Sequence, residues 1–352
     1  MRYLVVLLAL VLVGTPTCGA VEISGLDELW EQTERYGVTE GQSLEEGLSG
    51  LMEQAVHEAG GLLRDSIATG LKLLGVVLLC ALAESARLEG ANSGLRLTEM
   101  VGAVAITALT MTDMDTMIGL GRETVGRMDV FSGILLPVVA VLTAATGGVS
   151  SAALHRGAVM FFSKLLITAM DRLLIPLLYS YVAVSCAHAA VGNPGLKKLA
   201  DLLKSTVNFL LTAVLLAFVG YLTASGAVAG SVDASAVKAA KLAISRAIPV
   251  VGGILADASE SVLAGAGVLR GSVGVAGMLV VLAICLVPFL QLAVHYLVYK
   301  GTAALCAVVA QPRLSQLVDA IGSAFGLVLG MTGAAALVLL ISLVSAVSVV
   351  VT

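Results

Sequence analysis

The chain has 352 residues, of which 58% are hydrophobic and only 12% are charged, and its mean hydropathy is +1.01. Soluble globular domains carry about twice that share of charged residues, so the composition excludes an ordinary soluble domain, a disordered chain and a coiled coil. Aromatic residues make up 4% of the chain and glycines number 38, as in transmembrane helices that touch through small residues. The sequence therefore predicts an all-α polytopic membrane protein.

Charge is distributed unevenly along the chain. The formal net charge is -4, yet residues 21–65 alone contain eleven acidic residues against Arg35 and Arg64. The remainder is slightly basic but has no cluster of lysines and arginines, whereas binding to nucleic-acid phosphates needs several of them on one surface. We therefore expect the lipid bilayer as a partner and no nucleic acid.

The first twenty residues have the order of a secretory leader. Arg2 provides the positive start, Tyr3–Val13 forms an apolar core, and Cys18 precedes small residues that suit cleavage. The core is too short to cross a bilayer core of about 30 Å. A signal peptide is predicted over 1–20, with an uncleaved anchor or a lipoprotein modified at Cys18 as alternatives. Residues 21–65 are then an acidic, amphipathic, extracytoplasmic segment, because few basic residues oppose their translocation.

Apolar segments with the length of membrane spans follow the acidic segment. Seven or eight crossings are expected, because the segment 247–268 contains Asp257 and Glu260 and is interpreted as a span or as a re-entrant or interfacial hairpin. The segments lie at about 67–83, 97–112, 131–154, 157–190, 205–228, 247–268, 272–299 and 320–350.

Two parts of the chain match each other and predict an internal duplication, with chance similarity in a low-complexity sequence as the alternative. Two proline-containing motifs recur 112 residues later: Pro137-Val138-Val139 as Pro249-Val250-Val251, and Leu174-Ile175-Pro176-Leu177-Leu178 as Leu286-Val287-Pro288-Phe289-Leu290. A further set recurs 118 residues later: Pro194, Leu196, Leu199, Asp201 and Ser205 as Pro312, Leu314, Leu317, Asp319 and Ser323. The predicted division is first membrane spans at 66–112, membrane repeat A at 113–228 and membrane repeat B at 229–352.

Each copy is expected to contain one long helix bent at a proline. Residues 272–299 are predicted to kink at Pro288, where the ring and the missing N–H disturb the helix, and 157–190 is predicted to bend at Pro176. Three crossings per copy is an odd number, so the copies are expected to be inserted in opposite directions, as in many transporters.

Several motifs of the chain occur together in a known order. They are Leu136-Pro137-Val138, Gly147-Gly148-Val149-Ser150-Ser151, Ile248-Pro249-Val250-Val251-Gly252-Gly253, Asp257-Ala258, Gly274-Val275-Ala276-Gly277 and Ile284-Cys285-Leu286-Val287-Pro288. In this order and spacing, residues 120–350 resemble the stage III sporulation protein AE family. The N-terminal region contributes no matching motif.

The resemblance implies a non-enzymatic integral membrane component of the sporulation channel or transport apparatus between mother cell and forespore, needed for late forespore development. It implies the mother-cell membrane around the forespore as the location. The implied partners are other stage III A operon proteins, namely a cytosolic ATPase and intermembrane ring proteins, and indirectly stage II sporulation protein Q. The alternative function is a stand-alone secondary transporter or permease with inverted repeats.

No enzyme motif is present, and neither a cofactor nor a metal is predicted. The chain lacks a P-loop and the H-E-x-x-H and G-x-S-x-G motifs, and its four histidines lack metal-ligand spacing. One alternative is an intramembrane protease that uses Ser150 as its nucleophile, with His188 or His295 as the base. A serine near a helix end that bonds to its own backbone is the simpler interpretation.

Ionisable residues inside apolar segments are costly in hydrocarbon and are expected to face protein, water or the interface. A conduction role and plain pairing between helices are the two interpretations. The residues are Lys72, Glu99, Lys164, Asp171, Arg172, Asp257 and Glu260.

Small residues predict where helices approach closely and where one breaks. A stripe at Gly322, Gly326, Gly330 and Ala334, and a shorter one at Gly226 and Gly230, suit close helix contacts within the chain or between subunits. Gly252 and Gly253 follow Pro249 and free the backbone. A broken or re-entrant segment is therefore predicted near 249–266.

Overall fold

The computed structural model describes residues 43–85, 92–145, 149–224, 272–309 and 312–351, with Glu31, Thr33, Glu34 and Val38 before them. Its elements are all helical, and six of its helical runs within these ranges are long and apolar enough to cross a membrane. The predicted all-α, multi-pass architecture is therefore confirmed. The leader at 1–20 and the segment near 249–266 lie outside the described residues. The helices are α3 (Leu44–Ser85), α4 (Asn92–Ala145), α5 (Val149–Ala169), the π-helical turn η1 (Met170–Leu174), α6 (Ile175–Val191), α7 (Pro194–Ala224), α10 (Ser272–Val309) and α11 (Pro312–Val351).

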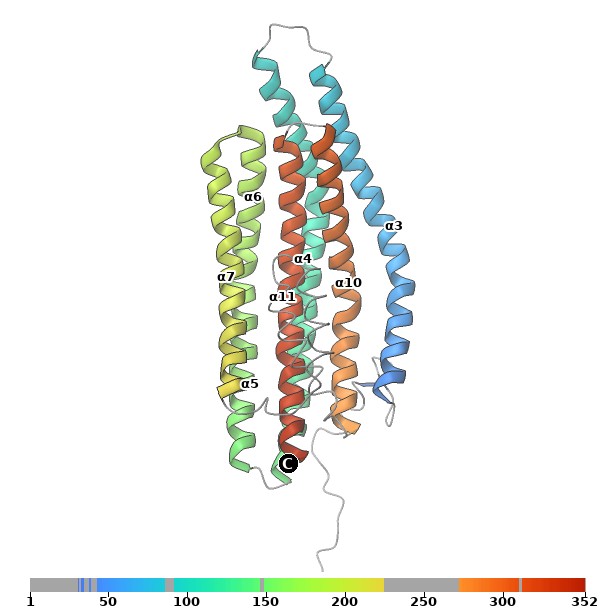
Figure 1. Cartoon of the computed structure of the whole chain (residues 1–352), viewed down its shortest axis with the longest axis vertical. Helices are drawn as coiled ribbons and strands as arrows, with labels where there is room; N and C mark the ends of the chain where they lie inside the picture. Colours follow the sequence, from blue (N-terminus) through green and yellow to red (C-terminus); the bar gives the residue numbers. More distant parts are fainter. Residues whose placement is uncertain are drawn as a thin grey trace, which may run out of the picture.

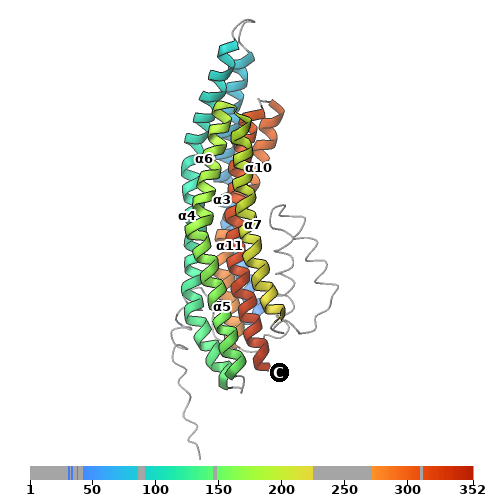
Figure 2. The same ribbon diagram turned by 90° about the vertical axis from the view of Figure 1, so that its left-hand side faces the viewer.

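The helices form an elongated bundle around α11. Figure 1 shows α11 between α10 on one side and α6 and α7 on the other, with α4 behind it, and Figure 2 shows the same bundle from the side. Within Pro312–Val344 of α11, an apolar stretch of 18 residues is 94% buried, whereas the corresponding stretches of the other candidate spans are 22% to 56% buried. A helix that is apolar on every side is expected at the centre of a bundle, and α11 has no charged residue between Ala320 and Val344.

Two helices are longer than the sequence predicted. The segments at 97–112 and 131–154 were expected as separate spans, but α4 is one helix of 54 residues that includes the charged stretch between them. Likewise α3, with 42 residues, joins the end of the acidic segment to the first span. A capping box begins α3, because Ser43 Oγ accepts a hydrogen bond from the Glu46 N–H (3.2 Å) and a Glu46 carboxylate oxygen accepts one from the Ser43 N–H (3.3 Å).

The two helical runs that were predicted to bend at prolines differ in regularity, since one is a continuous α-helix and the other contains a π-helical turn. Pro288 lies inside the uninterrupted α-helix α10. Pro176 lies in the first turn of α6, directly after η1, so the run from α5 to α6 contains a π-helical turn where the proline removes a donor.

The helices with matching sequences run in the same direction, which corrects the expectation of oppositely inserted copies. α6 and α10 both end at the upper end of the bundle in Figure 1, and α7 and α11 both begin there. The reason is that α7 ends and α10 begins at the same, lower end of the bundle in Figure 1.

Candidate functional site: a polar cavity at one end of the bundle

The turn between α6 and α7 is shaped by three consecutive residues. Gly192 has a φ of 74°, which suits glycine, and its N–H donates to the His188 carbonyl (2.7 Å) to end α6. The Asn193 side-chain oxygen accepts a hydrogen bond from the Gly195 N–H (2.8 Å), and Pro194 is the first residue of α7. The chain thereby reverses within two residues and places α7 against α6.

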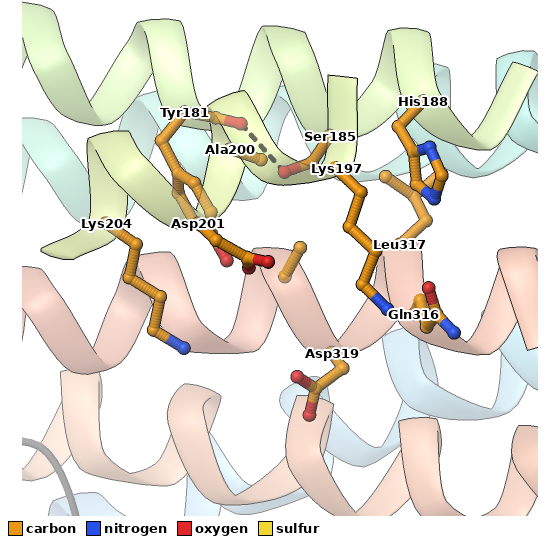
Figure 3. Close-up of a pocket in the computed structure, with 11 residues that line it drawn as sticks. Tyr181, Ser185, His188, Lys197, Ala200, Asp201, Lys204, Gln316, Leu317 and Asp319 are labelled. Atoms are coloured by element: carbon orange, nitrogen blue, oxygen red, sulfur yellow. Dashed lines mark hydrogen bonds between the residues drawn. The ribbon is translucent and has the colours of Figure 1, made fainter. Parts of the chain in front are cut away.

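A cavity of about 230 Å³ lies between α6, α7 and α11 close to this turn. Pro194 and Pro312 begin α7 and α11 at the same end of the bundle. Asp201 and Asp319, which the repeat had matched, therefore stand two turns inside their helices, and both line the cavity. Figure 3 shows the other polar side chains around it, which are Tyr181, Ser185 and His188 from α6, Lys197 and Lys204 from α7, and Gln316 from α11.

Two lysines from different helices meet at one serine beside the cavity. The Ser323 hydroxyl oxygen, whose side chain is buried, accepts hydrogen bonds from the Lys204 ammonium (3.1 Å) and from the Lys300 ammonium (2.8 Å). Lys300 also donates to an Asp319 carboxylate oxygen at 2.6 Å. This Lys–Ser–Lys–Asp cluster connects α7, α10 and α11.

Further polar contacts hold the same end of the bundle together. The buried Tyr299 hydroxyl donates to an Asp113 carboxylate oxygen (2.7 Å) and joins α10 to α4. Arg313, at the start of α11, forms an ion pair with Glu99 of α4 (2.5 Å), and only 13% of the Glu99 side chain is exposed. The Arg313 guanidinium lies in the space that a Cβ atom at position 192 would fill. A side chain at position 192 would therefore overlap Arg313, and it would also strain the backbone at this positive φ, so both effects favour glycine.

Three polar pairs form a row along the contact between α4 and the run formed by α5, η1 and α6. Asp115 accepts a hydrogen bond from the Tyr179 hydroxyl (3.2 Å). The other pairs are Arg122 with Asp171 (2.9 Å) and Asp129 with Lys164 (2.6 Å). The α4 residues follow each other at steps of seven, whereas those opposite are separated by seven and then by eight across η1. The structure thus gives the predicted Lys164 and Asp171 each an ion-pair partner on α4.

Other ionisable candidates have different surroundings. Arg172 is exposed and forms no ion pair with any described residue, Lys72 is exposed on α3, and Glu99 binds Arg313 as above. Asp257 and Glu260 lie outside the described residues, as do Pro249, Gly252, Gly253, Gly226 and Gly230.

The predicted glycine stripe of α11 lies against α10. A Cβ atom at Gly322 would lie 3.1 Å from Cβ of Tyr299, and one at Gly326 would lie 2.9 Å from two ring atoms of Tyr296. Gly330 and Ala334, further along the stripe, are buried. The close contacts at Gly322 and Gly326 are therefore within this chain.

The structure does not bring the residues of the protease alternative together. Ser150 is the second residue of α5, at the lower end of the bundle, and His188 lies in the last turn of α6, at the upper end. The His295 ring nitrogen Nδ1 lies 2.9 Å from the Gln291 carbonyl of its own helix. No group of three or more metal-binding side chains occurs among the described residues.

The sequence had matched Asp201 with Asp319 and Ser205 with Ser323, but it had not predicted that Lys204 and Lys300 would meet at Ser323. These two lysines lie in separate segments, and each alone resembles a residue near the end of a span. Their positions relative to the prolines that begin helices were the available signal. Lys204 follows Pro194 by about three turns, and Lys300 precedes Pro312 by about three turns.

Comparisons with known proteins identify the family. A family model described as stage III sporulation protein AE matches residues 38–350. Stage III sporulation protein AE of Bacillus subtilis (strain 168) is 24% identical over 268 residues, which cover 75% of this chain and 65% of that relative. No solved structure matches the chain. Because the matched region takes in all the described membrane helices, the chain belongs to the stage III sporulation protein AE family.

Proposed function

We propose that this chain is a non-enzymatic membrane component of the apparatus that joins mother cell and forespore, and that late forespore development requires it. Family membership makes it a sporulation membrane protein. The proposed location is the mother-cell membrane around the forespore. The proposed partners are the other stage III A operon proteins, namely a cytosolic ATPase and intermembrane ring proteins, and indirectly stage II sporulation protein Q.

One observation favours a component of an assembly over a protein that works alone. Charged side chains on candidate spans are exposed on the side of the bundle, including Arg122 (65% exposed) and Lys164 (64% exposed). Charged residues in membrane segments normally face protein or water, because hydrocarbon solvates them poorly. Other subunits, or water that they enclose, would cover this side of the bundle.

Charge also supports an orientation for the chain. Lys197, Lys300 and Arg313 gather at the end where α7 and α11 begin, whereas α3 begins at the other end with Glu45 and Glu46. Cytoplasmic loops are enriched in lysine and arginine. The cavity end would therefore face the mother-cell cytosol and the ATPase, and the acidic end would face the ring proteins between the membranes.

Deletion of the gene in a spore former tests the role. Engulfment should proceed normally and late forespore gene expression should fail, with recovery when the native chain is restored. Normal spores in a strain without a second copy of the gene would contradict the proposal.

An Arg172→Leu chain tests whether the charged side meets a partner. If lipid covers Arg172, removal of its charge should leave sporulation unchanged. If a partner with a carboxylate covers it, the variant should reach the membrane in normal amount but form at least tenfold fewer spores. The neighbouring Leu173→Ala, also on an exposed side chain, is the matched control and should sporulate normally.

A stand-alone secondary transporter is the second candidate, and the polar cavity between helices of matching sequence favours it. Transporters built from repeats often bind substrate where the repeats meet. Uptake of an ion or a solute by vesicles that contain only this purified chain would support this function, and its loss on Asp319→Asn would place the path at the cavity.

A further inference from the structure

The cavity region has more positive than negative groups. Lys197, Lys204 and Lys300 contribute three ammonium groups, against the two carboxylates of Asp201 and Asp319. Lys300 already binds Asp319 at 2.6 Å. On α7, Lys197 lies one turn before Asp201 and Lys204 lies one turn after it. These two ammonium groups share one neighbouring carboxylate, and neither forms an ion pair with it. Among these five groups, the positive charges exceed the negative charges by one.

The geometry at Ser323 concentrates this excess. Two ammonium groups that donate to the same hydroxyl oxygen lie within about 6 Å of each other, where their mutual repulsion is appreciable in a partly buried site. Each ammonium has three donors, and Lys204 uses one of them on Ser323. Its remaining donors are available to an anion in the cavity that it lines.

The rest of the lining suits a small group with oxygen acceptors. The Tyr181 hydroxyl and the Gln316 amide supply further hydrogen-bonding groups, as Figure 3 shows. Lys197 lies at the end of the first turn of α7, and negative charge is favoured near a helix N-terminus. A volume of about 230 Å³ lies below the usual range for organic ligands, about 300 to 1,000 Å³, and so suits an ionic group rather than a large molecule.

We propose that this cavity binds a phosphate group that carries a single negative charge, with Lys204 and Lys197 as the main ligands. A phosphodiester has that charge, and it matches the excess of one positive charge. Two sources share this chemistry. One is a soluble phosphate compound, and the other is the head group of an anionic phospholipid, which basic pockets between membrane helices bind.

Thermal unfolding of the purified full chain in a neutral detergent tests the soluble source. Potassium phosphate at pH 6, where the monoanion predominates, should raise the unfolding temperature of the native chain relative to potassium chloride at equal ionic strength, because a ligand of the folded state stabilises it. In Lys204→Met the apparent affinity should fall at least tenfold. Lys198→Gln is the matched control, since this neighbouring exposed lysine does not line the cavity, and it should respond as the native chain does.

Native mass spectrometry tests the lipid source. The chain taken from nanodiscs of mixed phosphatidylglycerol and phosphatidylcholine should retain phosphatidylglycerol preferentially, and Lys204→Met should not. If Lys204→Met fails to fold, the exposed Lys197→Gln replaces it in both experiments. Binding in either experiment supports the site and identifies the source. Absence of both responses, or equal responses in all variants, would overturn the proposal and would leave the proposed role in the apparatus untouched.

Discussion

The π-helical turn η1 accounts for the register between α4 and the helices opposite, and this can be tested by deleting one residue. Asp171 and Tyr179 are eight residues apart yet both contact α4. In a regular α-helix, at about 100° per residue, eight residues end about 80° away from the starting direction, whereas seven end only about 20° away. The wider turn η1 accommodates one extra residue, so Asp171 and Tyr179 point to the same side.

Deletion of Leu173 should therefore be tolerated. The exposed Leu173 lies in η1, and without it the run from α5 to α6 becomes a regular α-helix in which both contacts with α4 persist. The matched control is deletion of Ala183, which is also exposed but lies in the regular helix α6. That deletion rotates one part of the helix by about 100° and removes buried side chains such as Leu178 or Ala189 from the core.

The two deletions should differ clearly in stability. Loss of one large buried side chain costs about 2 to 5 kcal/mol, so the Ala183 deletion should lower the unfolding temperature strongly or prevent folding. The Leu173 deletion should change it by only a few degrees, because the exposed ion pair of Arg122 contributes at most about 1 kcal/mol. A thiol-reactive dye can follow unfolding in detergent through the buried, free Cys285 and Cys306. Equal destabilisation by both deletions would refute the register argument.

Three substitutions test other contacts with the same assay. Gly326→Leu should cost at least about 2 kcal/mol, because its side chain would overlap the Tyr296 ring; unchanged stability would show that the helices separate easily. Arg313→Ala should cost about 3 kcal/mol, since it leaves the nearly buried Glu99 carboxylate without its partner, and a cost below 1 kcal/mol would contradict this. Asn208→Leu should be neutral or stabilising by up to about 1 kcal/mol, because the buried Asn208 side-chain oxygen has no partner among the described residues; a clear loss would indicate a bound ligand or water there.

The sequence predicted the class of the protein because composition depends on the surrounding solvent. An excess of apolar residues in runs of about 20 is required for any chain that crosses a bilayer by helices, whatever its tertiary arrangement. Helix boundaries were predicted less well. The charges between 113 and 129 separate two apolar segments in a hydropathy profile, yet α4 passes through them. Asp115, Arg122 and Asp129 find partners 35 to 64 residues away, which no local pattern shows.

The polar cavity could be predicted only in part for the same reason. The match between Asp201 and Asp319 was visible, because both follow a proline at the same distance. That Lys204 and Lys300 would meet at Ser323 depends on the direction of three helices and on their rotation about their axes. Neither quantity is encoded in a single segment.

The direction of the helices explains why polar residues of both matching segments meet in one place. If the two copies were inserted in opposite directions, the turns that follow Pro194 and Pro312 would lie at opposite ends of the bundle, and Lys204 could not reach Ser323. Because α7 and α11 run in the same direction, both prolines begin helices at the same end, and the polar residues two or three turns later face the same cavity. Two helices that begin at the same end can bring their polar residues together at that end of a bundle, whereas inverted repeats place a shared site near the middle of the membrane.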